Sequence, residues 1–495
     1  MPAPAIRDRE SFEFRPISRS PKEKNKTMAA RDGLESLFDV VVLGGGNAAL
    51  CAAIVAARAG RRVVVLEGAP EFYRGGNTRH TRNLRCSHDG TAPTMTGPYE
   101  QQEFLDDLYR VTGGQTDKVL AEMTIARSRE LLPFMDELGV RFQPPLGGTL
   151  SLGKTNAFFL GGGRGMLNAL YRRAEALGVT CLYDAPVIRL QIEDGFFVSA
   201  TVKHEGREID VRGKTLVAAA GGFEANIEWL KQYWGAAADN FLIRGTPFNR
   251  GDVLRMLLDK GVAPVGDPTQ CHAVAIDARA PKFDGGIATR LDSVIFGIMV
   301  NRDAQRFYDE GEDTWPKRYA IWGRLIAQQP DQIGYSIVDS RSIRLFMPSI
   351  FPAIAAPTIA ELAGKLKLDQ AALTKTIDDF NAAVRPGTFD HTVLDDCRTE
   401  GLAIPKSHWA RRIEKPPYYA YPLRPGITFT YLGVKVNEES RIMLEDGRPS
   451  GNMFAAGEIM AGNVLGKGYL AGIGMTIGAV FGRLAGEGAA KHARN

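Results

Sequence analysis

The sequence has few cysteines, and they are widely separated. Five occur among 495 residues, and no two of them lie within four positions of each other. This spacing excludes C-x-x-C metal or redox motifs and the clustered cysteines of a ferredoxin-type iron–sulfur centre. A chain of this length needs no disulfide framework, so a reducing, cytoplasmic environment suits it. The five are Cys51, Cys86, Cys181, Cys271 and Cys397.

Long apolar runs are also missing. The charge-free stretch from Gly468 to Gly482 is rich in glycine and shorter than the ~18–20 residues of a membrane span. The first 37 residues lack the apolar segment of a secretory signal, and they are rich in charge, proline and serine. We expect 1–37 to be a disordered arm or, with Met28 as the true first residue, a misassigned start.

Charge of one sign is not in excess. The chain has 61 basic and 57 acidic residues, a net charge of +4, and no long basic stripe interleaved with aromatics. We therefore expect neither nucleic acid as a partner nor a bound metal. At 44% hydrophobic residues, a chain of 495 residues exceeds what one core usually serves. Two domains are expected.

What is present is a nucleotide-binding pattern between residues 38 and 77. The run DVVVL is typical of a strand buried on both faces, and Gly44-Gly45-Gly46-Asn47-Ala48-Ala49, a small apolar helix, the strand RVVVLE and Glu67 follow. Gly44 permits the tight turn, Gly46 lets the backbone approach a pyrophosphate, and Ala49 lets the helix lie close to the strand. The helix N-terminus attracts phosphate, and Glu67 accepts from a ribose hydroxyl. The unit predicts a bound dinucleotide.

A second loop favours FAD over NAD. Gly75, Gly76, Asn77 and Thr78 follow Glu67 closely, and a flavin needs contacts beyond its ADP half. The segment FFLGGGRGMLNALYRRAEALGVTCLYDAPV repeats the strand, glycines, helix and strand, but Met166 occupies the third fingerprint position and would hold the helix off a sheet. We interpret it as another strand–helix–strand unit of the same domain, without a nicotinamide site.

The chain resembles the flavoprotein subunits of the succinate dehydrogenase and fumarate reductase superfamily over about residues 38 to 490. The markers are GGGNAA, Glu67, GGNT at 75–78, AAAGGF at 218–223, QCH at 270–272, VNRDAQRFYDE at 300–310 and MFAAGE at 453–458. Four further stretches are similar to the tricarballylate dehydrogenases of that superfamily, which use FAD to oxidise tricarballylate to cis-aconitate. These are RGGNTRHTRNLR, FQPPLGGTLSL, DEGEDTWPKRYAIWG and YPLRPGITFTYLGVKV.

The resemblance implies an α/β fold in which an FAD-binding Rossmann-like domain (38–270 and 420–490) is interrupted by an α+β capping domain (271–419). MFAAGEI is expected to be a buried strand, and GYLAGIGMTIGAVFGRLAG a close-packed helix whose N-terminus faces the flavin. Besides the fingerprint and loop residues above, the implied FAD contacts are Val187, Ala220, Gly221, Gly222, Gly457, Glu458, Ala471, Gly472 and Ile473.

The implied chemistry removes hydrogen from two adjacent carbons of a polycarboxylic acid, with a hydride passing to flavin N5 and a proton to a base. Carboxylates need fixed cations or donors. In the superfamily a histidine in Q-x-H-P-T holds a substrate carboxylate; this chain keeps His272 but not the Pro and Thr. The family's proton-transferring arginine corresponds by strict spacing to Ser293, so Arg290 is the candidate only with a three-residue shift.

Two departures from the family pattern argue against plain succinate or fumarate. Phe429 stands where fumarate reductases have the histidine of H-T-M-G-G, and the lead into the last helix reads GKGYLAG without their arginine. A differently shaped acid is expected. Candidates to replace the missing ligands are Lys467, Tyr469, Arg424 and Tyr431.

Attachment and electron transfer follow from the same comparison. Succinate dehydrogenases link the flavin to a histidine before the loop threonine; this chain has Asn77 there, so noncovalent FAD is expected. Electrons should leave to a separate protein, and the resemblance implies an iron–sulfur and cytochrome b-type, membrane-bound partner through which the chain would be membrane-associated.

Rival interpretations stay open. The segment KPPYYAYPLRPG resembles 3-ketosteroid dehydrogenases, and a fumarate reductase-type enzyme or a flavoprotein of corrinoid synthesis is also close. Arg290, Arg318 and Arg324 predict a basic cap, which disfavours a steroid pocket. A non-catalytic, flavin-binding redox adaptor is the alternative of another class.

Overall fold

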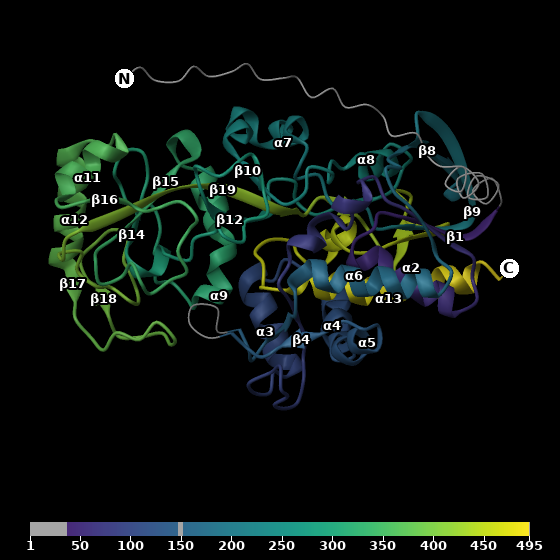
Figure 1. Ribbon diagram of the computed structural model, residues 1–495, viewed down its shortest axis with the longest axis horizontal. Coiled ribbons are helices and arrows are strands. Elements are labelled where there is room, and N and C mark those ends of the chain that lie inside the picture. Colours follow the sequence, from purple (N-terminus) through teal and green to yellow (C-terminus); the bar gives the residue numbers. More distant parts are fainter. Residues whose placement is uncertain (1–36, 147–151, 495) are drawn as a thin grey trace, which may run out of the picture.

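Two lobes, each built around its own β-sheet, make up the protein in the computed structural model, which describes residues 37–146 and 152–494. We call the lobe around the larger sheet the cofactor lobe and the other the cap lobe. Figure 1 shows the cap lobe in green on the left and the cofactor lobe on the right. The predicted N-terminal arm, except for residue 37, lies outside the described residues.

The cofactor lobe contains an eight-stranded sheet with the order β21-β22-β9-β1-β2-β6, extended by β8 and β7 beside β9. The pairs β9–β1, β1–β2, β2–β6 and β22–β9 are parallel, as in a nucleotide-binding fold. The strands are β1 (Phe38–Leu43), β2 (Val63–Leu66), β6 (Thr180–Leu182), β7 (Val187–Glu193), β8 (Phe196–His204), β9 (Arg207–Ala218), β21 (Arg441–Met443) and β22 (Pro449–Ala455).

The predicted strand–helix–strand unit is confirmed. Helix α2 (Asn47–Arg58) connects β1 to β2, and all four residues of β2 are buried. The β-branched valines fill both faces of the parallel strands, and the alanines of α2 let the helix lie close to them. Gly44 has φ +97°, and a Cβ there would clash with the Ala219 carbonyl oxygen, so the turn requires glycine.

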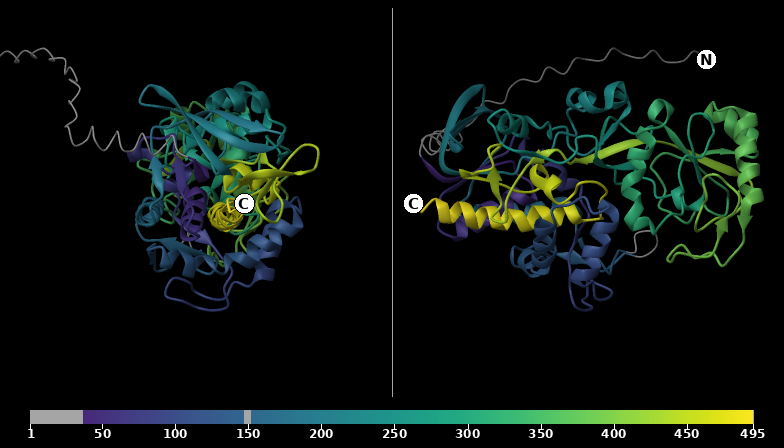
Figure 2. Two further views of the ribbon diagram at one scale, coloured as in Figure 1. Left: turned by 90° about the vertical axis from the view of Figure 1, so that its right-hand side faces the viewer. Right: turned by 180° about the vertical axis from the view of Figure 1, so that it is seen from behind.

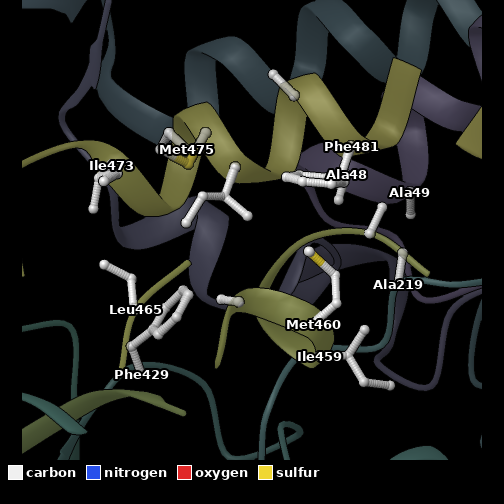
Figure 3. Packing of buried hydrophobic residues seen from close by; sticks show 14 of the residues in the cluster. Ala48, Ala49, Ala219, Phe429, Ile459, Met460, Leu465, Ile473, Met475 and Phe481 are labelled. Carbon is white, nitrogen blue, oxygen red and sulfur yellow. The ribbon is translucent and has the colours of Figure 1, made fainter. Parts of the chain in front are cut away.

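The last helix packs on α2. Helix α13 (Ile473–His492) runs along the cofactor lobe, away from the cap (Figure 2, right). Gly478, Gly482 and Gly486 lie on one face of it, and a Cβ at Gly482 would be 2.5 Å from the Ala48 carbonyl oxygen. Figure 3 shows Ala48, Ala49 and Phe481 in this apolar contact. The predicted close-packed helix is confirmed, although it begins at Ile473.

The cap lobe contains a seven-stranded mixed sheet centred on the long strand β19 (Tyr418–Thr430), which runs from the cap toward the cofactor lobe (Figure 1). β19 pairs with β10, β12, β15 and β16. The other strands are β10 (Leu242–Arg244), β12 (Cys271–Asp277), β13 (Phe283–Asp284), β14 (Ile298–Val300), β15 (Gly334–Val338) and β16 (Ile354–Ala356). β10 precedes the expected domain boundary at 270, and β19 crosses the one at 420.

The remaining helices cover the two sheets. In Figure 2, α3 and α4, in blue, lie below the cofactor lobe, and the green cap helices lie at the far end from α13's C-terminus. The helices are α3 (Gln101–Thr112), α4 (Lys118–Ser128), α5 (Leu131–Glu137), α6 (Gly162–Ala176), α7 (Ile227–Trp234), α8 (Asp252–Leu258), α9 (Trp315–Arg318), α10 (Trp322–Ala327), α11 (Ile359–Leu366) and α12 (Gln370–Ala383). Within the described ranges, no helix combines the length and apolarity needed to cross a membrane.

Residues 158–187 form the predicted strand–helix–strand order, but the two strands do not share a sheet. β5 (Asn156–Phe159) pairs antiparallel with β3 (Asn83–Arg85) and β4 (Phe142–Gln143) in a separate three-stranded sheet, whereas β6 pairs with β2 in the main sheet. The strands on either side of α6 therefore belong to different sheets. Local sequence does not contain this information, because sheet membership is decided by distant partners.

Candidate functional site

A cavity of about 290 Å³ lies between the two lobes and is lined by both. Its walls come from the β1–α2 turn, the 75–78 loop, the segments after β9 and β22, the start of α13 and the cap strands. Of the predicted FAD contacts, the cavity lining includes Gly44, Gly46, Asn47, Ala48, Glu67, Gly75, Gly76, Asn77, Thr78, Val187, Ala220, Gly221, Gly457, Glu458 and Gly472.

Two long helices begin at this cavity with a glycine as N-cap. Gly46 precedes α2 and Gly472 precedes α13, and neither offers a side chain to cap the helix. The Asn47 amide donates to Thr78 Oγ1 at 3.1 Å, and the Gly474 amide donates to Tyr469 Oη at 3.2 Å. Other first-turn amides and both helix dipoles are left to attract negative charge.

Glu67 lies buried at the end of β2, where its carboxylate is already oriented. Oε1 accepts from the Ala69 amide at 2.9 Å and Oε2 from the Gly75 amide at 3.0 Å. Burial raises its pKa, and the backbone amides that it accepts from oppose that rise. The 75–78 loop is thereby attached to the second strand, which brings the two predicted nucleotide-binding segments together.

Glycines allow close packing of the segments that form the cofactor wall of the cavity. A Cβ at Gly45 would lie 2.5 Å from Glu67 Oε2, and one at Gly478 would lie 2.9 Å from Asn47 Nδ2. The absence of side chains at these positions lets α2, β2 and α13 pack closely around the cavity. The glycines and free helix N-termini of this wall suit the phosphates of an FAD.

His272, on β12, lies at the cap wall of the cavity and is buried. Its ring stacks on Tyr469 with centroids 3.8 Å apart and an interplanar angle of 2°. Neither ring nitrogen has a hydrogen-bond partner within residues 37–146 and 152–494. Burial, with Arg244 and Arg290 nearby, lowers its pKa well below the usual range. A neutral imidazole with both nitrogens unpaired is suited to contact a ligand.

Three guanidinium groups lie on the cavity wall beside this histidine. Arg290 donates to Asp292 Oδ2 at 2.8 Å and lies 5.0 Å over the Tyr319 ring. Arg244, at the end of β10, donates to the Gly286 carbonyl at 3.3 Å and to Thr428 Oγ1 at 3.2 Å. Arg82 donates to the Ile287 carbonyl at 3.2 Å. In the described part of the chain, neither Arg82 nor Arg244 forms an ion pair with a carboxylate.

The arginines repel one another, as their pKa values show. Burial and the neighbouring Arg290 lower the pKa of Arg244 to about 10. Burial, Arg290 and Arg244 lower the pKa of Arg82 to about 9. Burial acts to lower the pKa of Arg290 as well, but Asp292 and Tyr319 reverse this and the pKa is raised. The wall therefore carries more positive charge than its own carboxylates neutralise.

Three predicted substrate contacts are not among the residues that line the cavity. Arg424 donates to the Asp331 carbonyl at 2.8 Å, inside the cap lobe. Tyr431 is fully buried and donates to the Gly468 carbonyl. Lys467 lies near Gly113. Among predicted FAD contacts, Ala49, Gly222, Ala471 and Ile473 lie next to lining residues without being among them.

The structure also changes which arginines make the cavity basic. The prediction of a basic cap named three. Of the three arginines it used, Arg290 lines the cavity, whereas Arg318 and Arg324 do not. Arg318 pairs with Glu312 at 2.7 Å. The positive charge at the cavity comes instead from Arg244 and Arg82, which sequence reasoning missed.

A weak signal for these missed residues is present in the sequence. Arg244 ends the apolar run FLI and precedes a glycine, and Arg82 follows the GGNT loop by four positions. Tyr319, which also lines the cavity, had no signal beyond its place in a stretch similar to the tricarballylate dehydrogenases. No group of three or more His, Cys, Asp or Glu side chains that could hold a metal occurs within the described residues.

Comparison with known proteins places the chain among flavoproteins. The profile of a family described as "FAD binding domain" matches residues 39–475. The chain is 25% identical to a probable fumarate reductase, Ifc3, of Shewanella frigidimarina, over 98% of this chain and 82% of that protein. It is 27% identical to a urocanate reductase of Eggerthella lenta (95% and 77%) and 26% identical to an NADH:acrylate oxidoreductase of Vibrio harveyi, of which it spans about half (52%).

Solved structures confirm the fold. The open conformation of a flavocytochrome c3 fumarate reductase matches with a TM-score of 0.73 at 22% identity, over 98% of this chain and 86% of that one. A 3-ketosteroid-Δ4-(5α)-dehydrogenase of Rhodococcus jostii RHA1 matches with a TM-score of 0.70 at 23% identity, over 92% and 97%. The predicted fold class, a Rossmann-like FAD-binding domain with a capping domain, is thus confirmed.

Proposed function

This chain belongs to the FAD-binding flavoprotein family of the fumarate reductases and succinate dehydrogenases, and from that premise we propose that it desaturates a polycarboxylic acid. It is an FAD-dependent oxidoreductase. The reaction would remove two hydrogens from adjacent carbons, and tricarballylate, giving cis-aconitate, is the substrate we propose. Three relatives act, by their names, on fumarate, urocanate and acrylate, and each of these acids has a C=C bond next to a carboxylate.

The observation that carries this proposal is the group of Arg82, Arg244 and Arg290 on one cavity wall. Their single ion-pair partner among the described residues is Asp292, which binds Arg290. Among the described residues, the guanidinium groups of Arg82 and Arg244 form no ion pair, and both are partly or wholly removed from water. Such an arrangement is costly unless a ligand brings negative charge, and a fork of N–H donors matches a carboxylate.

FAD supplies the two-electron acceptor when bound. The residues that would hold it are those at the start of α2, Glu67, the 75–78 loop and the start of α13, because they form the glycine-lined wall of the same cavity. We propose that it is bound noncovalently. The acid would lie between this wall and the cap wall.

The polar side chains around His272 have separate tasks in this proposal. His272 is neutral, so it donates one N–H to a carboxylate oxygen and leaves its other nitrogen as an acceptor. Arg244 and Arg82 hold the remaining carboxylates. Tyr469 keeps the imidazole ring in place by stacking on it. Together these contacts fix the two carbons that lose hydrogen.

Arg290 stays charged in the free protein. Its pKa is raised, with burial opposed by Asp292 and Tyr319, and a guanidinium that holds its proton is a carboxylate anchor rather than a free base. Proton transfer by Arg290 therefore rests on the family resemblance, and we propose its anchoring role first.

We propose that a separate redox protein, of the membrane-bound iron–sulfur and cytochrome b type, receives the electrons. Quinol–fumarate reductase and succinate dehydrogenase complexes are among the structural neighbours, although at 15–16% identity this likeness concerns the fold. The described residues contain no candidate metal centre that could pass the electrons on.

The deciding experiment is an anaerobic substrate panel read at the flavin absorbance. We expect tricarballylate to bleach the flavin, and succinate and 3-ketosteroids to leave it oxidised. Bleaching by a steroid would favour the dehydrogenase of that class, and reduced flavin reoxidised by fumarate would favour the reductase. No response to any small acid would favour a redox adaptor.

The variant Arg244→Gln tests the proposed anchor. It keeps hydrogen-bonding capacity but removes the charge, and we expect about a 10- to 100-fold loss in kcat/KM, corresponding to roughly 1.5–3 kcal/mol for a charge-assisted hydrogen bond. Arg318→Gln is the matched control, since Arg318 pairs with Glu312 and does not line the cavity. Equal losses in both variants would contradict the assignment.

A further inference from the structure

Two buried carboxyl groups lie side by side under the FAD cavity. Glu224 follows the turn after β9, and Glu458 begins the short 3₁₀ segment after β22 and lines the cavity. Gly222 lies between them. A Cβ at Gly222 would be 2.9 Å from Glu224 Oε2 and still closer to Glu458 Oε1. Oxygens of the two side chains therefore converge on one small volume.

The two carboxyl groups of this pair have different hydrogen-bond partners. Glu224 Oε1 accepts from Asn77 Nδ2 at 2.6 Å and from Asn249 Nδ2 at 2.8 Å. Glu458 Oε1 accepts from the Thr430 amide at 2.9 Å. Glu224 Oε2 is buried without a partner among the described residues. Within the described residues, neither carboxyl group forms an ion pair with a lysine, arginine or histidine.

Two adjacent buried carboxylates without a cation cannot both be ionised, because each disfavours the charge of the other. A proton between them removes that repulsion and gives the unpaired oxygen of Glu224 a donor. Burial raises the pKa of both groups, that of Glu224 to about 7, and Glu224 raises that of Glu458 further. Glu458 is thus the group that retains the proton.

We propose that Glu458 carries a proton at neutral pH and donates it in a hydrogen bond to the Glu224 carboxylate, and that this shared proton fixes the wall of the FAD cavity. The bond would join four segments: the 75–78 loop through Asn77, the turn after β9, the end of β19 through Thr430, and the segment after β22.

Few charged groups surround the pair. Asn77, Asn249 and Thr430 supply neutral donors from three segments. Tyr469, before α13, is a neutral phenol whose pKa is raised by burial first and by Glu458 in part. Arg244 reaches the end of β19 through Thr428 Oγ1 and makes no hydrogen bond to either carboxyl. The proton on Glu458 is therefore held by Glu224.

The pH dependence follows from the direction of the shifts. An acid whose pKa is higher in the folded state holds a proton that the unfolded chain has released. Its contribution to folding stability is therefore present at low pH and is lost as the pH rises from the unfolded value of 4.5 through the folded one. Loss of the proton leaves two negative charges together and loosens the cavity wall, so FAD should dissociate more readily at alkaline pH.

Infrared spectroscopy of the FAD-bound protein, as the difference between spectra in H₂O and D₂O, tests the proton directly. We expect the carbonyl band of a protonated carboxylic acid near neutral pH, with the isotope shift typical of exchange into D₂O. The band should be absent in Glu458→Gln and present in Glu228→Gln, a control in which the exposed Glu228 pairs with Lys231. Absence of the band from the unmodified protein would overturn the proposal, whether or not the variants fold.

A second measurement follows the stability of the protein and its affinity for FAD as the pH changes. Thermal unfolding and FAD dissociation are measured from about pH 5 to about pH 8. The unmodified protein and Glu228→Gln should lose stability and FAD affinity as the pH rises. Glu458→Gln, whose amide donates to Glu224 at any pH, should show a weaker dependence. The same dependence in all three proteins would contradict a shared proton. These outcomes do not depend on which acid is the substrate.

Discussion

At the scale of single residues, the unusual feature is a neutral histidine among cations. Burial is the largest cause that lowers the pKa of His272, and Arg244 and Arg290 add to it. A positive imidazole would add a further charge to a wall that already has too many. In the proposed function, the ring therefore recognises its ligand by hydrogen bonds, and the arginines supply the charge.

The neutral state of His272 predicts an unusual pH profile. His272→Gln should weaken binding of the acid, and the ratio of its dissociation constant to that of the unmodified protein should stay constant from about pH 5.5 to about pH 8. A charged imidazole would make the ratio fall as the pH rises through its ordinary value of 6.5. Flavin absorbance titrations measure both constants, and His88→Gln, at a surface histidine bonded to Gly90 and Lys154, is the control.

The side chain of Asn77 has all its strong hydrogen-bonding groups engaged by protein. It donates to Glu224 Oε1 at 2.6 Å and to the Thr428 carbonyl at 2.7 Å, and it accepts from the Thr246 amide at 2.8 Å. An amide in this position is no nucleophile, so we expect acid precipitation to release the yellow colour into the supernatant. Colour that remains in the pellet would show a covalent link, and His80, which also lines the cavity, would be the first residue to examine.

At the scale of elements, the contact between α13 and α2 depends on glycines. Gly482→Ala adds a methyl group 2.5 Å from the Ala48 carbonyl oxygen, a backbone atom that cannot move aside cheaply. We expect a loss of about 1–3 kcal/mol in the free energy of unfolding, although alanine favours helices by about 1 kcal/mol over glycine. Denaturant titration measures the change.

The matched control is Gly364→Ala in α11. Gly364 is exposed, and the nearest atom to an added Cβ is Gln370 Nε2 at 3.4 Å. Here the helix preference of alanine should dominate and raise stability by about 0.5–1 kcal/mol. Changes of the same sign at the two positions would show that packing does not decide the outcome at Gly482.

Elements with a strong local pattern could be predicted from the sequence. A short window of sequence predicts the local structure in three places: the valine runs of β1 and β2, the glycines before α2 and the small residues of α13. β19 could not be outlined in this way, because Pro422 and Pro425 lie inside it and proline is rare in central strands. Its strand state depends on partners such as Tyr335 and Ala275, which are remote in the sequence.

The same limit explains the site. The predicted nucleotide-binding residues lie in contiguous motifs, and most of them line the cavity, whereas the three arginines beside His272 come from the 75–82 region, β10 and the segment after β13. Only folding brings them together, and nothing in the sequence near Arg82 or Arg244 indicates that the other is close. Arg424 and Arg318 had equally suggestive surroundings and lie elsewhere.

At the scale of the whole molecule, two ion pairs between residues that the structure describes connect the lobes. Lys317 of α9 lies 2.7 Å from Asp107 of α3, and Asp313 lies 3.3 Å from Arg110, also of α3. Asp107 is held on the cofactor side by Tyr99 Oη at 2.8 Å. The cap therefore contacts a fixed carboxylate of α3.

Lys317→Met should loosen the contact between the lobes more than it lowers the stability of the fold. Partly exposed ion pairs contribute at most about 1 kcal/mol, so we expect a melting temperature only slightly lowered. Hydrogen exchange should rise in α9 and α10 and stay unchanged in β1 and β2. In the control Lys154→Met, which removes a pair with Glu103 inside the cofactor lobe, exchange in α9 should not change. Unchanged exchange in both variants would show that the pair does not restrain the cap.

The course of β19 has a practical consequence for hybrid proteins. β19 is one uninterrupted strand that pairs with β16 near its start. Near its end, Thr428 contacts Arg244 and Thr430 contacts Glu458. A chimera that exchanges caps between relatives should therefore join its parents outside 418–430. A junction within the strand that gained or lost one residue would turn every following side chain to the opposite face and separate the substrate wall from the flavin wall.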